Sequence, residues 1–498
     1  MIAEGFASVM LDPFVILLIA IGVVVGIIFG SIPGLTATMA VVMFLPVTYT
    51  MTSTQGISML VALYIGGISG GLISAILLNI PGTPSSVATC FDGRPMAEKG
   101  EAGKALGTGV IFSFIGTVLG VLILIVISPV LASVALKFGP FEYCALAIFS
   151  LSLVITLTGK DMVKGLISAV LGALLATVGL APIDSKPRFT FGIVNLTAGF
   201  KLLVLLIGLF AITEVVKYAE GVRKPENFTI EGNVKIKGVG FSLKEFIRGI
   251  PNAIRSTLIG VGIGILPGIG GGVSCMISYT VAKNTSKHPE KFGTGIMDGV
   301  IASETANNAT IGGAMIPLLS LGIPGDAVTA MLLGGLMVHN VSPGPLIFQK
   351  SGSVVYGVFF SMLIAAVFMC VFMLLGMRGF IRVLNIPKNY LLPIIVVLCC
   401  VGAIGDSNRL FDVWGVLIFG IMGYALIKAK IPLSPMILGF ILGPTFESNV
   451  RKVSQLISRD SVFSHPIFCV FILVTAVVVV ISLRSNKRER EALSKEKQ

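Results

Sequence analysis

Apolar segments of membrane-spanning length fill most of this chain, and the polar stretches between them are short. A helix needs about 20 residues to cross the hydrocarbon layer of a bilayer, so the segments allow about a dozen crossings, some of them broken or short. The longest polar stretch, Lys217 to Arg248, is a loop by its length. The pattern therefore predicts an all-α polytopic membrane protein without a sizeable soluble domain.

Composition agrees with this interpretation. Of the 498 residues, 55% are hydrophobic and 12% are charged, whereas soluble domains carry about 25% charged residues. A net charge of +12 would suggest nucleic acid for a soluble protein. Here the basic residues lie in loops and in the C-terminal tail, where the positive-inside rule explains them.

Charge placement also predicts the orientation of the chain. The basic tail and the basic Lys217–Arg248 loop are both expected in the cytoplasm. The first twelve residues are expected outside, because they hold Glu4 and Asp12 and no basic residue. The Asp92–Lys104 loop is charge-balanced and indicates neither side.

The two halves of the chain carry the same two motif blocks in the same order. Gly26, Gly30, Pro33 and Gly34 match Gly260, Gly264, Pro267 and Gly268 at one constant spacing, and the block 68–82 resembles the block 311–325. If the start lies outside and the central loop inside, the first half crosses an odd number of times. We therefore expect inverted-topology repeats with broken or re-entrant helices. The expected segments are a first repeat at 1–219, a linker loop at 220–248, a second repeat at 249–450, a C-terminal helix at 451–484 and a cytoplasmic tail at 485–498.

Four near-copies of one tripeptide interrupt the apolar sequence. They are Ile32-Pro33-Gly34, Ile80-Pro81-Gly82, Leu266-Pro267-Gly268 and Ile323-Pro324-Gly325. Proline removes an amide donor and clashes with the preceding helical turn, and glycine permits conformations that other residues avoid. Broken backbone inside a bilayer survives only where protein buries it or where it lines a wet cavity. The four breaks therefore predict a binding site built of helix ends, as in secondary transporters.

Small polar residues follow the breaks and suit the start of a new helix. The first turn of such a helix has free amides and about half a positive charge, which makes it an anion site. Carbonyls freed at the preceding helix end can hold a cation. The predicted substrate-binding residues are Pro33, Gly34, Thr36, Thr38, Pro81, Gly82, Thr83, Ser85, Ser86, Pro267, Gly268, Gly270, Asn307, Asn308, Pro324 and Gly325.

A polar cluster precedes the fourth break, in the segment Ser303-Glu304-Thr305-Ala306-Asn307-Asn308. A charge at mid-membrane costs about 2.5–3.5 kcal/mol on insertion scales, so Glu304 there indicates a pathway. Helical spacing places Glu304, Asn307 and Asn308 on one face; the alternative is an exposed loop. Asp326 fits a coupling cation better than an anion, and its alternative is a plain helix cap. The predicted coupling-ion residues are Ser303, Glu304 and Asp326.

Two other classes of function stay open on the sequence. One is an ion channel. The other is an intramembrane serine hydrolase, because Gly67-Ile68-Ser69-Gly70 matches the pattern around such a nucleophile, although that chemistry needs a facing histidine. His339 is interpreted as a structural histidine. The sequence carries no P-loop, so we expect neither ATP hydrolysis nor enzymatic activity.

Several motifs resemble the large membrane subunit of the tripartite tricarboxylate transporters, the TctA family. They are the segments 30–36, 265–271, 299–309, 323–326 and 334–345, and the stretch Ser303–Asn308 makes the resemblance specific. The resemblance implies a bacterial inner-membrane permease that works with a small TctB-like membrane subunit and a periplasmic TctC-like solute-binding protein. It also implies uptake of tricarboxylates or related organic acids, driven by a Na⁺ or H⁺ gradient. No cofactor is expected beyond a coupling ion such as Na⁺. We further expect alternating access, with an elevator-like movement of the motif-bearing elements.

Overall fold

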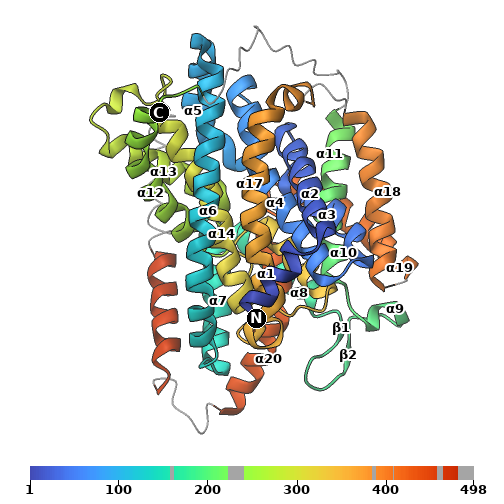
Figure 1. Cartoon of the computed structure of the whole chain (residues 1–498). Coiled ribbons are helices and arrows are strands. Elements are labelled where there is room, and N and C mark those ends of the chain that lie inside the picture. Colours follow the sequence, from blue (N-terminus) through green and yellow to red (C-terminus); the bar gives the residue numbers. More distant parts are fainter. Residues whose placement is uncertain (158–161, 222–239, 384–387, 408, 457–463, 481–498) are drawn as a thin grey trace, which may run out of the picture. The chain divides into compact units, whose positions relative to one another are not determined.

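The computed structural model describes residues 1–157, 162–221, 240–383, 388–407, 409–456 and 464–480. These residues are almost entirely helical (Figure 1), and the single sheet described is a two-stranded antiparallel pairing of β1 (Gly179–Leu180) with β2 (Pro187–Arg188). Within the described ranges, six helical stretches are long and apolar enough to cross a membrane, and shorter apolar helices accompany them. The all-α polytopic fold class is thereby confirmed. The predicted tail at 485–498 lies outside the described residues.

The chain divides into two compact units, each built from two separate stretches of sequence. Unit 1 comprises Met1–Ser133 and Tyr218–Asp406, and unit 2 comprises Val134–Lys217 and Ser407–Gln498. Each unit therefore takes one stretch from each predicted repeat. The repeat boundaries themselves stay a prediction.

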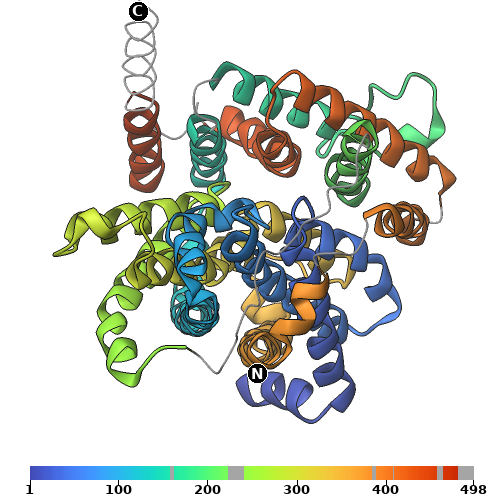
Figure 2. The ribbon, with the colours of Figure 1, turned by 90° about the horizontal axis from the view of Figure 1, so that it is seen from above.

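Unit 1 contains both motif-bearing stretches. Its first stretch holds α1 (Ile2–Met10), α2 (Pro13–Ser31), α3 (Ala37–Phe44), η1 (Pro46–Thr50), α4 (Ser53–Leu78), η2 (Pro84–Ser86), α5 (Val87–Met96), η3 (Ala97–Glu101) and most of α6 (Ala102–Ala135). Its second stretch holds α12 (Leu243–Gly264), α13 (Gly270–Thr285), η6 (Pro289–Lys291), α14 (Met297–Leu321), α15 (Ala327–Val338), α16 (Ile347–Lys350), α17 (Gly352–Val383) and α18 (Lys388–Ser407). The long helices α6 and α17 stand upright in Figure 1 and appear end-on in Figure 2, so they run nearly parallel.

Two predicted loops are partly or wholly helical. The Lys217–Arg248 stretch begins inside α11 (Thr213–Gly221) and ends inside α12, where a capping box of Ser242 and Glu245 starts the helix. The Asp92–Lys104 stretch is helical on both sides of a kink at Gly100, whose φ is +82°. The Asp92–Lys104 loop prediction is therefore wrong, and the Lys217–Arg248 loop is shorter at both ends than predicted, while residues 222–239 lie outside the described residues.

The internal repeat is visible in helix packing. In the first half, a methyl group added to Gly26 would lie 2.5 Å from the Leu63 carbonyl oxygen. In the second half, a methyl group added to Gly260 would lie 2.4 Å from the carbonyl oxygen of Ala306. The α2–α4 pair and the α12–α14 pair thus approach through glycines at matching positions, which is how small residues allow close helix packing in lipid.

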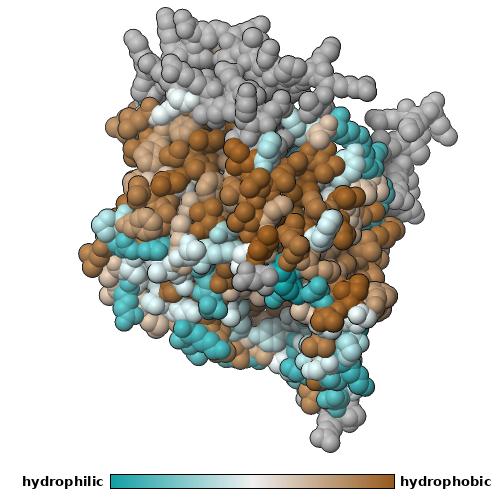
Figure 3. Space-filling model, turned by 90° about the vertical axis from the view of Figure 1, so that its right-hand side faces the viewer, coloured by the Kyte–Doolittle hydropathy of each residue, from teal (hydrophilic) through white to brown (hydrophobic). Residues whose placement is uncertain are grey.

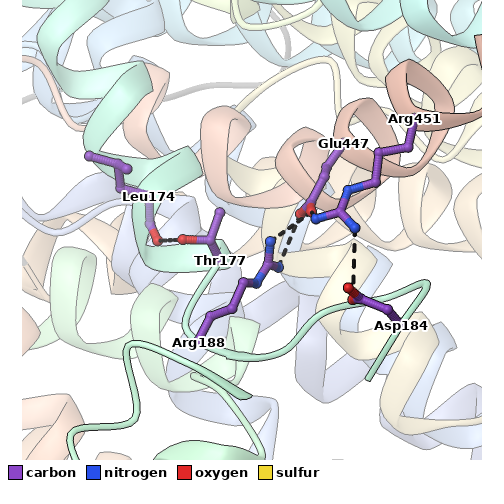
Figure 4. A network of polar contacts seen from close by, with 6 residues as sticks. All are labelled: Leu174, Thr177, Asp184, Arg188, Glu447 and Arg451. Carbon is purple, nitrogen blue, oxygen red and sulfur yellow. Dashed lines mark hydrogen bonds and ion pairs between the residues drawn. The ribbon is translucent and has the colours of Figure 1, made fainter. Parts of the chain in front are cut away.

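Unit 2 holds α7 (Pro140–Leu157), α8 (Met162–Ala176), the β1–β2 hairpin, α9 (Val194–Thr197), α10 (Leu202–Leu206), η5 (Ile207–Ile212), α11, α19 (Leu410–Lys428) and α20 (Ser434–Leu456). Residues 466–480, within the predicted C-terminal helix, are also helical. Ion pairs between side chains connect the hairpin to α20 (Figure 4). Arg188 donates two hydrogen bonds to the Glu447 carboxylate, at 2.7 and 3.1 Å, and Arg451 contacts both Glu447 and Asp184.

Some helices carry a stripe of exposed apolar side chains, and such a face is suited to contact with lipid. On α19 the exposed residues Leu410, Trp414, Ile418 and Ile421 recur at helical spacing, which is the pattern of a single apolar face. Figure 3 shows a broad area of hydrophobic side chains on the face that it presents.

Candidate functional site

All four Pro-Gly breaks fall between helices of unit 1. They separate α2 from α3, α4 from η2, α12 from α13, and α14 from α15. Gly34 and Gly268 have φ of +85° and +79°, a left-handed conformation that glycine adopts without steric cost. The tripeptides therefore act as the sequence indicates, by ending one helix so that another can begin.

The four breaks lie against one another. The Gly268 amide donates a 2.8 Å hydrogen bond to the carbonyl oxygen of Gly325, which joins the third break to the fourth. A methyl group on Gly82 would lie 2.2 Å from the Gly30 carbonyl oxygen, at the end of the helix that precedes the first break. A methyl group on Gly271 would lie 3.0 Å from Cβ of Ser85, so the third break also meets the second. The structure thus brings together helix ends from both halves of the sequence.

Three of the four chain segments that follow a break are capped by side chains. Thr36 accepts from the Met39 amide at 3.2 Å and caps α3, and Thr83 with Ser86 forms a capping box at η2. Asp326 and Thr329 form a capping box that starts α15. The N-cap residue of α13, Ile269, makes no side-chain cap. The amides at the start of α13 therefore differ from those of α3 and α15.

Most predicted substrate residues are buried near these contacts. Thr38, Thr83, Ser85, Ser86, Asn307 and Asn308 are buried, as are Pro33, Gly82, Pro267, Gly270, Pro324 and Gly325, whereas Thr36, Pro81 and Gly268 are partly exposed and Gly34 is exposed. Their role in binding stays a prediction.

Asp326 has the geometry of a helix cap, which was the alternative to its predicted role with a cation. One carboxylate oxygen accepts from the amide and hydroxyl of Thr329, both at 2.7 Å. The other accepts from the Tyr64 hydroxyl at 2.6 Å. The carboxylate is thus held by three donors, and its part in ion coupling stays a prediction.

The Ser303–Asn308 segment is a buried part of α14, not an exposed loop. Glu304 is fully buried and accepts hydrogen bonds from the hydroxyls of Thr89 and Ser113, the latter at 3.0 Å. The Thr89 hydroxyl oxygen is also 3.2 Å from the Ser303 hydroxyl oxygen. Among the described residues no ion pair involves Glu304, so hydroxyl groups alone are seen to stabilise its carboxylate.

The predicted polar face of α14 divides in two. Glu304 and Asn308 both bond to Ser113 of α6. Asn307 instead lies beside the start of α13, where its Oδ1 would be 2.6 Å from a methyl group on Gly271. Residues three and four apart on a helix lie on the same side of it but point in somewhat different directions. Here Glu304 and Asn308 point to α6, and Asn307 points to the third break.

Sequence reasoning missed three residues that hold the site together. Tyr64 bonds to Asp326, and Arg94 donates to the Leu77 carbonyl oxygen just before the second break. Asp92 is completely buried and accepts from the amides of Gly293, Gly295 and Ile296, which fixes the loop before α14. Nothing in the sequence marked Tyr64 within its apolar run, and Asp92 and Arg94 were read as part of a charge-balanced loop.

Residues of the hydrolase alternative have other partners. The Ser69 hydroxyl donates to Oδ1 of Asn308 at 2.6 Å. His339 is hydrogen-bonded to the Thr48 hydroxyl at 3.1 Å, in agreement with the structural histidine that was predicted. His465, another of the three histidines in the sequence, contacts Glu142 in unit 2.

The fold and the site define a multi-pass membrane protein with paired helix breaks around a buried polar centre. A family model described as the tripartite tricarboxylate transporter TctA family matches residues 16–438, and the chain belongs to this family. The predicted resemblance is confirmed, and family membership implies a transporter within a tripartite system.

Two relatives come from Agrobacterium vitis. One, described as an uncharacterized 52.8 kDa protein in the TAR-I ttuC' 3' region, is 36% identical over 451 residues, which cover 90% of this chain and 89% of the relative. The other, described as an uncharacterized protein in the TAR-II ttuC' 3' region, is 35% identical over 231 residues, which cover 46% of this chain and 95% of that protein. No solved structure matches the chain.

Proposed function

We propose that this large subunit imports tricarboxylates or related organic acids by alternating access, driven by a Na⁺ or H⁺ gradient. The observation that carries the proposal is the hydrogen bond between the third and fourth breaks, Gly268 to Gly325, in a unit that holds all four breaks. Helix starts gathered in this way present several amides to one point, which favours a ligand with negative charge. Ser303, Glu304 and Asp326 are the proposed coupling-ion residues.

The proposed partners are a small TctB-like membrane subunit and a periplasmic TctC-like solute-binding protein, in a bacterial inner membrane. The chain would begin outside and end in the cytoplasm. Because unit 1 contains every break, we propose that it carries the substrate during transport, in an elevator-like movement.

The test is uptake of labelled citrate and other carboxylates by cells that produce all three subunits, under imposed Na⁺ or pH gradients. We expect saturable uptake that requires the solute-binding protein and one of the two gradients.

Gly268→Val should abolish uptake while the protein still reaches the membrane, because it alters the backbone that joins two breaks. Glu304→Gln should weaken the dependence on the gradient. Unsaturable flux without the binding protein would instead indicate a channel, and normal uptake by Gly268→Val would contradict the proposed site.

A further inference from the structure

Two neighbouring asparagines on α14 differ completely in their hydrogen bonding. Asn308 is fully satisfied: its Oδ1 accepts from Ser69 at 2.6 Å and from Thr117 at 3.4 Å, and its Nδ2 donates to Ser113 at 2.8 Å and to the Glu304 carbonyl oxygen at 3.1 Å. Asn307 is only 1% exposed, yet neither its Oδ1 nor its Nδ2 has a partner among the described residues. A buried polar group without a partner costs about 1–3 kcal/mol. Asn307 is therefore the buried amide in this segment that is available to a ligand.

The surroundings of Asn307 supply a second, independent sign of a ligand. Its Oδ1 lies next to Gly271, in the first turn of α13. That 16-residue helix begins without a side-chain cap, whereas α3 and α15, which follow the first and fourth breaks, each have one. Uncapped amides at the start of a helix attract anions. Free amides and a free side-chain amide thus meet at one place.

The absence of a side chain at Gly271 leaves room between α14 and η2. A methyl group there would lie 2.6 Å from Oδ1 of Asn307 and 3.0 Å from Cβ of Ser85. The Ser85 hydroxyl is 3.0 Å from the Thr83 hydroxyl, and either can be the donor. If Thr83 donates to Ser85, the Ser85 proton is available to a ligand. With that orientation the place is lined by amide donors on the side of α13 and by the Ser85 hydroxyl on the side of η2.

Asn307 adds one requirement that a plain carboxylate does not meet. Backbone amides, the Ser85 hydroxyl and Nδ2 of Asn307 are donors and suit carboxylate oxygens. The Oδ1 atom of Asn307 is an acceptor, and an ionised carboxylate has no proton to give it. A hydroxyl on the carbon next to a carboxylate would supply that proton, because its oxygen is only three bonds from the carboxylate oxygens that the donors bind.

We propose that Asn307 is a specificity-determining residue that recognises the hydroxyl group of a 2-hydroxycarboxylate bound at the start of α13. This rests on the proposed function, because it assigns the substrate of that same site. A site built to bond a hydroxyl rejects an analogue without it, since the buried acceptor is then left unpaired.

The experiment compares citrate with tricarballylate, which has the same three carboxylates and lacks the hydroxyl. Binding of each is measured by calorimetry on the purified full-length chain in detergent, with NaCl present, at pH 7.5. We expect the unaltered protein to bind citrate at least about 10-fold more tightly. Malate and succinate form a second pair with the same difference, and we expect the same preference.

Two variants separate Asn307 from its surroundings. Asn307→Leu should bring the affinity ratio close to one, because neither ligand then meets an unpaired acceptor. Ser85→Ala is the matched control. It removes a donor to the carboxylate, so it should weaken the binding of both ligands equally and leave the ratio of their affinities unchanged.

The possible results distinguish this inference from the proposed function. Equal affinities for citrate and tricarballylate in the unaltered protein would overturn the role of Asn307 while leaving carboxylate transport intact. An unchanged ratio in Asn307→Leu would do the same, and would indicate that water satisfies the amide. If no carboxylate binds at all, both the inference and the proposed substrate class fail. Since the first comparison needs no variant, a variant that does not fold leaves the test valid.

Discussion

The Tyr64 hydroxyl donates a 2.6 Å hydrogen bond to Oδ2 of Asp326, which joins the middle of α4 in one half of the sequence to the fourth break in the other. Tyr64 is almost completely buried. Asp326 caps α15, and its Cβ would be 3.3 Å from a methyl group on Gly270 after the third break. This single hydrogen bond therefore connects α4 to the place where the third and fourth breaks meet.

Removing that hydroxyl should damage both stability and transport. We expect Tyr64→Phe to lower the free energy of unfolding by about 1–3 kcal/mol, because it leaves one carboxylate oxygen without its donor. Carboxylate uptake should fall as well, since the start of α15 loses a support. Thermal unfolding of the purified protein and uptake per inserted molecule measure the two effects.

Tyr279→Phe is a matched control for this change. The Tyr279 hydroxyl also donates to a buried aspartate, Asp92, at 2.8 Å, but Asp92 keeps three backbone amide donors. We expect a similar or smaller loss of stability with uptake largely retained. Equal loss of uptake in both variants would mean that Tyr64 acts on stability alone.

Gly82 and Gly325 occupy equivalent positions in the two halves, and both are closely surrounded. A methyl group would lie 2.2 Å from the Gly30 carbonyl oxygen in the first case, and 2.7 Å from that of Gly264 in the second. Gly82→Ala and Gly325→Ala should therefore each destabilise the protein by about 1–3 kcal/mol or more. We expect uptake to fall by at least about tenfold in both, if tight packing of the breaks is needed for transport.

Gly262→Ala tests whether close packing is the cause. Gly262 lies in α12 with no atom within 4 Å of an added methyl group. Alanine is favoured over glycine inside a helix by about 0.5–1 kcal/mol, so this variant should be as stable as the original or slightly more stable. A defect in Gly262→Ala comparable to that of Gly82→Ala would contradict the steric explanation.

The sequence predicted the fold class and the breaks because both depend on local chemistry. A Pro-Gly pair ends a helix wherever it lies, and a long apolar run excludes water in any context. Which break meets which is a tertiary property. The Gly268–Gly325 hydrogen bond joins residues from two motifs, and nothing in either motif specifies the other.

Hydrogen-bond partners were equally beyond sequence reasoning. Asn307 and Asn308 are the same residue type at adjacent positions, yet one is saturated by protein groups and the other has no partner among the described residues. A rotation of about 100° per residue along the helix decides which neighbour each one meets. Tyr64 illustrates the same limit, since its hydroxyl gives no signal inside an apolar run.

The ion network of unit 2 allows a prediction about pH. Glu447 receives two hydrogen bonds from Arg188 and contacts Arg451, and these interactions hold the pKa of its carboxyl below the ordinary value of 4.5. A group whose pKa is lowered on folding contributes stability above its unfolded pKa, and loses that contribution as the pH falls through the folded pKa. The contribution should therefore be complete near pH 7 and decline below about pH 4.5.

Glu447→Gln removes this contribution at every pH. Near pH 7 the variant should be less stable than the original by about 1 kcal/mol or less, because the pair is partly exposed to solvent. The difference should shrink as the pH falls below about 4.5, measured by thermal unfolding in detergent across a pH series. Glu4→Gln, at an ion pair that is mostly exposed, is the control and should change stability by under about 0.5 kcal/mol throughout. A difference between Glu447→Gln and the original that grows on acidification would contradict the assigned sign.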